Sequence, residues 1–230
     1  MALIALVGWN GPVMEAVSAQ DAKDASPTTH ETPSPSSYVF LQKFPLQHTN
    51  GFIFHTEVLV CDRSGFAPDD QTLLDDKVAS LEDFVELDEN WWTTQTANCV
   101  EFGYGGAMCN EHCCGVPHHD AQKNFPLNDR RAVISNADTS QKSLFLYGVS
   151  TALDGEAAYH RLCDHKCWSN WAGTDYNPLT NNCNTLTSTV LHCVFGLSEK
   201  KPNLGPSDMV KVTCDKCPAD ADAAAKVDIR

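Results

Sequence analysis

The chain has 230 residues, enough for one globular domain with additional terminal segments. Hydrophobic residues make up 42% and charged residues 20%, as in ordinary folded proteins, and no apolar run reaches the roughly 18 residues that a membrane-spanning helix needs. The formal net charge of −14 disfavours binding to nucleic acid and to anionic membrane surfaces. We therefore expect no nucleic-acid partner and no membrane span.

The two ends of the chain are predicted to lie outside the folded body. Residues 1–19 resemble a signal peptide, because they begin with an apolar run and end in the small residues AVSA. No basic residue precedes that run, so a disordered tail is the alternative. Residues 20–37 are rich in proline, serine and threonine and are predicted to be a disordered linker, while residues 218–230 are a predicted flexible tail. The folded domain is expected over residues 38–217.

The first half of this domain shows two strand patterns and one helix pattern. Residues 51–61 (GFIFHTEVLVC) are dense in aromatic and β-branched side chains, which predicts a strand with both faces largely covered. Apolar residues at helical spacing predict a helix or helical turns within residues 69–87. Residues 98–106 (NCVEFGYGG) indicate a short strand that ends in a glycine turn.

The second half of the domain is predicted to contain one strand followed by two helices. Residues 143–149 form the strand, and residues 155–166 form a helix with Asp154 as its N-cap. Residues 185–195 carry an apolar stripe and form the last helix, with Gly196 at its C-terminal cap. This order of strands and helices predicts an α+β fold.

The eleven cysteines bear on the compartment in which the protein works. In an exported chain, ten of them can form five disulfides and leave one free thiol. In a cytosolic chain, metal binding or catalysis better explains so many cysteines. Together with the N-terminal segment, the cysteine content favours secretion or the lumen of the secretory pathway, with the cytoplasm as the alternative.

One cysteine stands where a helix is expected to begin. Residues 181–185 read NNCNT, which places Cys183 at the N-terminus of the last helix, where free N–H groups and the helix dipole lower a thiol pKa. A thiolate is a nucleophile, and a histidine beside it can act as base and then as acid. His55, on the first predicted strand, is the candidate for that role. Asn182 and Asn184 are candidate oxyanion donors, although each can equally be only a helix cap.

Three segments resemble one protein family. Residues 176–187 read YNPLTNNCNTLT, residues 51–56 read GFIFHT, and residues 101–106 read EFGYGG. In this order they are similar to the Tyr-Asn…Asn-Cys-Asn-Thr, Gly-x-x-x-His-Thr and Glu-Phe…Gly-Gly motifs of the PPPDE family. That family comprises permuted papain-fold thiol peptidases and includes the DeSI desumoylating isopeptidases.

The resemblance covers approximately residues 38–209 and carries expectations about fold and chemistry. It implies a circularly permuted papain-like α+β fold, with an antiparallel sheet packed against helices. It also implies a catalytic dyad in which Cys183 is the nucleophile and His55 is the general base and acid. The resemblance assigns a role to no other individual residue of this chain.

A cysteine-rich insertion over residues 109–127 departs from compact members of the family and lies next to the glycine turn. Its side chains offer enough ligands for a zinc ion: Cys109, His112, Cys113, Cys114, His118 and His119. The chain has no two Cys-x2-Cys knuckles at zinc-ribbon spacing, so we expect disulfides here and assign no metal and no cofactor.

The sequence therefore predicts a cysteine peptidase or isopeptidase that hydrolyses amide bonds in a protein or peptide substrate. A ubiquitin-like conjugate is the expected substrate if the protein is intracellular. Two alternatives remain open. The first is a thiol acyltransferase or another amidase, and the second is a secreted, disulfide-rich binding protein without turnover.

Overall fold

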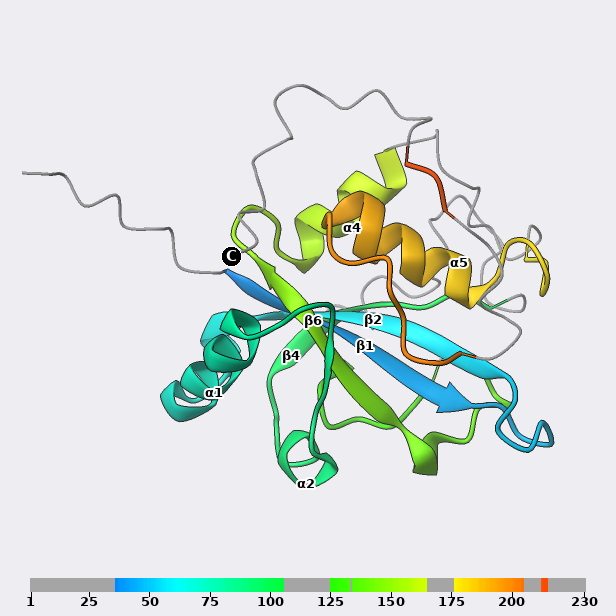
Figure 1. Cartoon of the computed structure of the whole chain (residues 1–230), viewed down its shortest axis with the longest axis horizontal. Coiled ribbons are helices and arrows are strands. Elements are labelled where there is room, and N and C mark those ends of the chain that lie inside the picture. The colour runs from blue at the N-terminus through cyan, green and yellow to red at the C-terminus, as the bar shows by residue number, and fades with distance from the viewer. Residues whose placement is uncertain (1–35, 106–124, 133, 165–175, 205–211, 215–230) are drawn as a thin grey trace, which may run out of the picture. The chain divides into compact units, whose positions relative to one another are not determined.

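A computed structural model of the protein describes residues 36–105, 125–132, 134–164, 176–204 and 212–214. These residues form an α+β fold around one open sheet of six antiparallel strands (Figure 1). The predicted α+β class and antiparallel sheet are therefore confirmed. No helix among the described residues is long and apolar enough to cross a membrane.

The longest strands lie in the middle of the sheet. In sheet order the strands are β3 (Val85–Glu86), β6 (Ser143–Ser150), β1 (Ser37–Pro45), β2 (Phe54–Asp62), β4 (Asn98–Phe102) and β5 (Phe125–Pro126). β1 pairs with β2 along its whole length and with β6 from Ser37 to Lys43. Both faces of β1 and β2 are buried, as expected for strands so rich in aromatic and β-branched residues.

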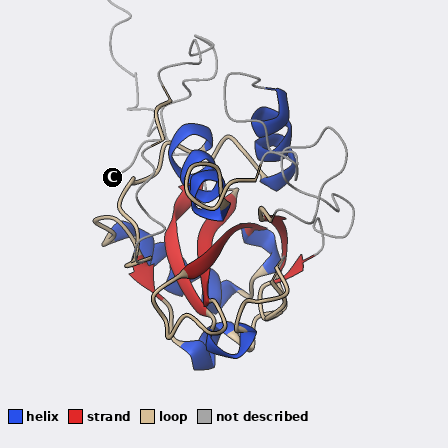
Figure 2. Cartoon of the chain, turned by 90° about the vertical axis from the view of Figure 1, so that its right-hand side faces the viewer, coloured by secondary structure: helices blue, strands red, loops and turns tan. Residues whose placement is uncertain are grey.

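Helices cover the sheet on both faces (Figures 1 and 2). They are α1 (Pro68–Ala79), α2 (Glu89–Trp92), α4 (Gly155–Asp164) and α5 (Cys183–Ser188), with α5 continuing directly into a π-helical segment, η4 (Thr189–Val194). Two 3₁₀ turns, η1 (Arg63–Gly65) and η2 (Thr139–Gln141), complete the described helical structure.

The alternation of side chains along each strand divides the core into two clusters. On one face, Val58 and Val60 of β2 pack with Leu162 of α4 and with Leu186 and Val190 of α5 and η4. On the other face, Leu59 and Cys61 pack with Leu74 of α1 and Trp92 of α2. The sheet therefore separates α4 and α5 from α1 and α2.

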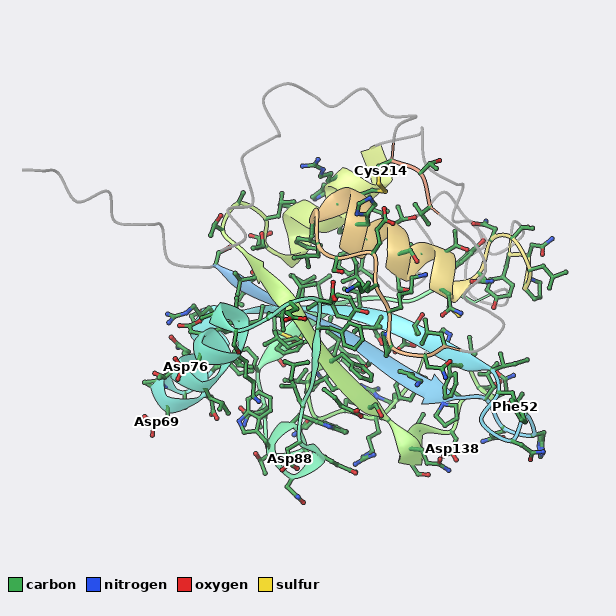
Figure 3. All side chains as sticks on the ribbon, viewed as in Figure 1. Phe52, Asp69, Asp76, Asp88, Asp138 and Cys214 are labelled. Carbon is green, nitrogen blue, oxygen red and sulfur yellow. A yellow bond between two sulfur atoms is a disulfide. The ribbon has the colours of Figure 1, made fainter. Side chains whose placement is uncertain are left out.

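Two disulfides join elements of the described structure. Cys61–Cys99 links directly opposed residues of β2 and β4. Cys193–Cys214 fastens residues 212–214 to η4, beside which Figure 3 labels Cys214. Cys183 is a free cysteine, and it is buried.

Most predicted elements are present, with shifted boundaries. The strands predicted at residues 51–61, 98–106 and 143–149 are β2, β4 and β6, and the predicted helix at residues 155–166 is α4. The carboxylate of Asp154 accepts from the backbone N–H of Ala157 at 2.7 Å, so it caps α4 as predicted.

Two sequence predictions need correction. The helix predicted within residues 69–87 ends at Ala79, because Val85 and Glu86 pair with Leu146 and Phe145 of β6 and so belong to the sheet. The last helix begins at Cys183, two residues earlier than predicted, because the side chain of Asn182 caps it. The predicted signal peptide, the flexible tail and most of the cysteine-rich insertion lie outside the described residues.

Candidate active site

The local sequence around Cys183 starts a helix at that residue. Asn182 is extended, and its Oδ1 accepts from the backbone N–H groups of Asn184 and Thr185 at 2.9 and 3.1 Å. The Thr185 hydroxyl accepts from the backbone N–H of Asn182 in return, which completes a capping box. Cys183 is therefore the first helical residue, and it retains 5% exposure.

His55 lies on β2 just beyond the point where β4 ends. β4 pairs with β2 only from Val58 to Cys61, so the stretch of β2 that carries His55 and Thr56 is not covered by β4. Cys183 occupies this position, because the backbone N–H groups of Thr56 and Asn184 both donate hydrogen bonds to its sulfur. The end of a strand and the start of a helix therefore meet at the thiol.

Thr56 holds the strand and the helix together. Its hydroxyl donates to Oδ1 of Asn184 at 2.6 Å and lies 3.0 Å from the hydroxyl of Thr187, one turn further along the helix. All three side chains are buried. Since Thr56 follows His55 and Asn184 follows Cys183, these contacts fix the two candidate catalytic residues relative to each other.

The two nitrogens of the His55 ring have different environments. Nε2 lies 2.8 Å from Oε1 of Glu57, and both side chains are completely buried. Nδ1 makes no well-aligned hydrogen bond with another described residue, and it is the nitrogen left to approach the Cys183 sulfur. The approach is close enough for the thiol and the ring to shift each other's pKa.

The electrostatics of the site favour an ion pair. Burial by itself raises the pKa of Cys183, but the charge and hydrogen bond of His55 and the backbone N–H groups of Thr56 and Asn184 lower it below its usual value. Burial lowers the pKa of His55, but the Cys183 thiolate and Glu57 outweigh that effect and raise it to about 10. The opposite pKa shifts of Cys183 and His55 therefore both favour a thiolate beside an imidazolium over the neutral pair.

A tyrosine pair lies beside the sulfur. Burial and the neighbouring Cys183, to which Tyr176 also hydrogen-bonds, raise the pKa of Tyr176, so its hydroxyl remains a proton donor. The Tyr176 ring packs edge-on against Tyr104, with 5.1 Å between the ring centroids. Asn181 Nδ2 donates to the Tyr104 hydroxyl at 3.3 Å. The segment before Cys183 is therefore tied to the end of the β4 region.

A buried polar cluster lies behind His55. Gln42 of β1 sits opposite Glu57, and its Nε2 donates both to Glu57 Oε2 and, at 3.1 Å, to Glu101 Oε1 on β4. Lys142 is 4% exposed and donates to the carbonyl oxygens of Leu127 and Asp129 at 3.3 and 2.8 Å. Two carboxyl groups, one amide and one ammonium are thus enclosed on the side of β2 that carries His55.

The structure distinguishes the two asparagines that the sequence suggested as oxyanion donors. Asn182 uses its oxygen for the helix cap, and its Nδ2 donates to the Pro178 carbonyl at 2.8 Å. Asn184 lies at the site itself, where its Oδ1 accepts from Thr56 and is 3.8 Å from the Cys183 sulfur. The oxyanion role of either residue remains a prediction, and the described geometry shows Asn182 as a cap.

Sequence reasoning proposed roles for Cys183 and His55, which the structure brings together, but none for Glu57, Thr56 or Tyr176. Glu57 had a detectable signal: it lies two residues after His55 on a predicted strand, so both side chains point to the same face. A charged residue inside an otherwise apolar strand needs a partner. The contact between Thr56 and the helix had no local signal, since its partners lie more than 120 residues away.

The described residues contain no group of three or more metal-ligating side chains. The cysteine and histidine cluster considered for zinc lies within residues 109–119, outside the described residues. Comparison of the chain with protein-family models, curated proteins and solved structures finds no significant match. The functional interpretation therefore depends on the site geometry and on the three sequence motifs.

Proposed function

We propose that this protein is a thiol hydrolase of the cysteine peptidase or isopeptidase type, with Cys183 as nucleophile and His55 as general base and acid. The observation that carries the proposal is a free thiol at a helix N-terminus in contact with a buried histidine, with the thiol pKa lowered and the histidine pKa raised. Perturbations in opposite directions are typical of a nucleophile and its proton-transfer partner.

The chemistry follows from the ion pair. The Cys183 thiolate attacks the carbonyl carbon of an amide, and the pair of electrons of the C=O double bond moves to oxygen. His55 then gives its Nδ1 proton to the leaving amine as the tetrahedral intermediate collapses to a thioester. The neutral ring takes a proton from water, the hydroxide attacks the thioester, and the carboxylic acid leaves as the thiolate re-forms.

The three sequence motifs support a permuted papain-like arrangement of this sheet and these helices. In that arrangement the strand that carries the histidine precedes the helix that carries the cysteine, as β2 precedes α5 here. An antiparallel sheet covered by the helix that bears the nucleophile is consistent with it.

A polypeptide is the proposed substrate. Two exposed apolar side chains stand in the segments that lead into the dyad: Phe52, 68% exposed, precedes His55, and Leu179, 79% exposed, precedes Cys183. Figure 3 shows Phe52 on the hairpin between β1 and β2. Such exposed apolar side chains, in segments that lead into the dyad, give a polypeptide apolar surface to contact.

An oxidising compartment is proposed as the place of action, since the described structure contains two disulfides. Secretion or the secretory-pathway lumen fits this better than the cytoplasm. A substrate in that compartment is a secreted or luminal polypeptide. A conjugate of a ubiquitin-like protein is the substrate only if the protein acts in the cytoplasm.

The test is the rate at which iodoacetamide alkylates Cys183 at pH 6, followed by peptide mass spectrometry. We expect fast alkylation in the wild type and alkylation at least about 10-fold slower in His55→Ala, because loss of the imidazolium raises the thiol pKa. His160→Ala is the matched control, since His160 is exposed and contacts Glu156 rather than the thiol.

Cleavage of a casein or peptide-library substrate that is lost in Cys183→Ala would identify a peptidase. Transfer of an acyl group to an amine acceptor would instead identify an acyltransferase. A folded wild-type protein whose Cys183 reacts no faster at pH 6 than a model thiol would contradict the dyad and leave the binding protein as the interpretation.

A further inference from the structure

The buried side chains behind His55 form a continuous chain across three strands. Glu57 Oε1 contacts His55 Nε2 at 2.8 Å, Glu57 Oε2 accepts from Gln42 Nε2, and the same nitrogen donates to Glu101 Oε1 at 3.1 Å. Glu101 also hydrogen-bonds to Glu57. These side chains are at most 3% exposed, so water does not separate the charges.

A hydrogen bond between two carboxyl groups requires a proton on one of them, because two carboxylates have only acceptors. Burial and the negative charge of Glu57 raise the pKa of Glu101 well above its usual range, which makes Glu101 the protonated member. Glu57, which accepts from Gln42 and contacts the His55 ring, is the charged member.

The charges nearby balance under this assignment. Burial lowers the pKa of Lys142 to about 8 although Glu57, Glu101 and Asp129 oppose it, so the ammonium remains charged near neutral pH. Asp129 is paired with Arg131, so the Lys142 charge balances Glu57, and the His55 imidazolium balances the Cys183 thiolate. A second carboxylate would leave a net buried negative charge, which is unfavourable.

We propose that Glu57 is a positioning residue for His55, and that the Glu57–Glu101 pair carries one shared proton and one negative charge directed at the Nε2 atom of the ring. The proposal rests on the thiol-hydrolase function proposed above and deepens it. Glu57 fixes Nε2 as the protonated nitrogen in both states of the ring. Nδ1 is therefore the atom that gains and loses the transferable proton, and it is the atom that approaches sulfur.

This role differs from simple core packing. A carboxylate that accepts from Nε2–H selects the neutral tautomer with a bare Nδ1, which is the form that accepts a proton from water during deacylation. The same charge stabilises the imidazolium that acylation consumes. Replacing the carboxylate by an amide of equal size keeps the packing and removes the negative charge, while the amide oxygen can still accept from Nε2–H.

The experiment compares two isosteric variants, Glu57→Gln and Glu101→Gln, by the pH profile of Cys183 alkylation with iodoacetamide. The wild-type profile should show one step where the ion pair forms and a second, near pH 10, where His55 loses its proton. Glu57→Gln should move the upper step down by about one pH unit or more, because an opposite charge beside the ring is lost. Glu101→Gln should leave it in place, since Glu101 is already neutral.

Circular dichroism and thermal unfolding of each variant verify that it is folded. A Glu57→Gln profile that superimposes on the wild type, or an equal shift in Glu101→Gln, would overturn the assignment while leaving the dyad intact. Failure of the wild type itself to show low-pH alkylation of Cys183 would instead count against the proposed function.

A second measurement needs no variant. In ¹⁵N-labelled wild-type protein, the ring nitrogens of His55 should show Nε2 protonated across the titration and Nδ1 losing its proton at high pH. Observation of the opposite neutral tautomer, with Nδ1 protonated and Nε2 bare, would contradict a charged Glu57 that accepts from Nε2.

Discussion

Thr56 is the residue on which the relative position of Cys183 and His55 depends. Its hydroxyl joins Asn184 and Thr187, and its backbone N–H donates to the sulfur. Thr56→Val keeps the size and the backbone donor but leaves the buried Asn184 oxygen without this hydroxyl. We expect the free energy of unfolding to fall by about 1–3 kcal/mol and Cys183 alkylation at pH 6 to slow.

Urea unfolding and the alkylation rate measure the two effects separately. Thr72→Val is the matched control, because the exposed Thr72 hydroxyl donates only to the Pro68 carbonyl within α1. An unchanged alkylation rate in folded Thr56→Val would show that the contact stabilises the fold without aligning the dyad.

The ion pair also predicts how stability depends on pH. The pKa of His55 rises from 6.5 to about 10 on folding. The stabilisation of the folded state by His55 is therefore complete below pH 6.5 and is lost as the pH rises through 10. The pKa of Cys183 falls from 9.0, so its contribution is present above pH 9 and is lost as the pH falls through the lower folded value. Between pH 6.5 and 9 an imidazolium–thiolate pair and the unfolded side chains hold the same number of protons, because the unfolded histidine is neutral and the unfolded thiol is protonated.

We therefore expect the stability difference between the wild type and the Cys183→Ala/His55→Ala double variant to be level across pH 6.5–9. It should decline toward acid, where the unfolded histidine binds a proton, and toward pH 10, where the unfolded thiol has lost one. Urea unfolding at six pH values measures this difference. A difference that changes steadily across the neutral range would contradict the ion pair.

At the level of elements, the packing of α4 on the sheet depends on a glycine. A Cβ added to Gly155, the first residue of α4, would lie 2.5 Å from the side chain of Val100 on β4. We expect Gly155→Ala to lower the free energy of unfolding by about 1–3 kcal/mol through overpacking, although alanine has the higher helix propensity. Thermal unfolding of the variant and the wild type checks this. A stabilised Gly155→Ala variant would show that α4 can move away from β4 at little cost.

The elements that local sequence predicted are those with a strong pattern of their own. β2 combines aromatic and β-branched residues without a breaker, and α4 follows a capping aspartate. β1 was not predicted as a strand, because Gln42 and Lys43 interrupt its apolar run and because a polar segment precedes it. The two-residue strands β3 and β5 form only through pairing with β6 and β4, which no local pattern reveals.

The candidate site also has one part that a local sequence pattern predicts and one part that depends on strand pairing. Cys183 and its cap Asn182 are adjacent in sequence, so the helix start could be predicted from a short motif. The groups that surround His55 come from β1, β2 and β4, and strand register alone brings Gln42 and Glu101 to Glu57. The contacts of these buried polar groups could therefore not be predicted from local sequence, because they depend on how the strands pair.

For the whole molecule, the Cys61–Cys99 disulfide closes a segment of 38 residues that includes α1 and α2. Replacing both cysteines by alanine should lower the free energy of unfolding by about 3–4 kcal/mol, because the unfolded chain gains conformational freedom. The disulfide lies in the half of β2 that pairs with β4, away from His55. Cys183 alkylation per folded molecule should therefore stay at the wild-type rate.

Peptide mapping without reductant, after alkylation of the native protein, provides the corresponding measurement on the unmodified chain. We expect label on Cys183 and none on Cys61, Cys99, Cys193 or Cys214. Label on all five cysteines would instead indicate a reducing environment. That result would argue against an oxidising compartment and would still permit the dyad. A Cys183 that is protected by a disulfide would exclude thiolate catalysis in that state, whatever the arrangement of His55 and Glu57.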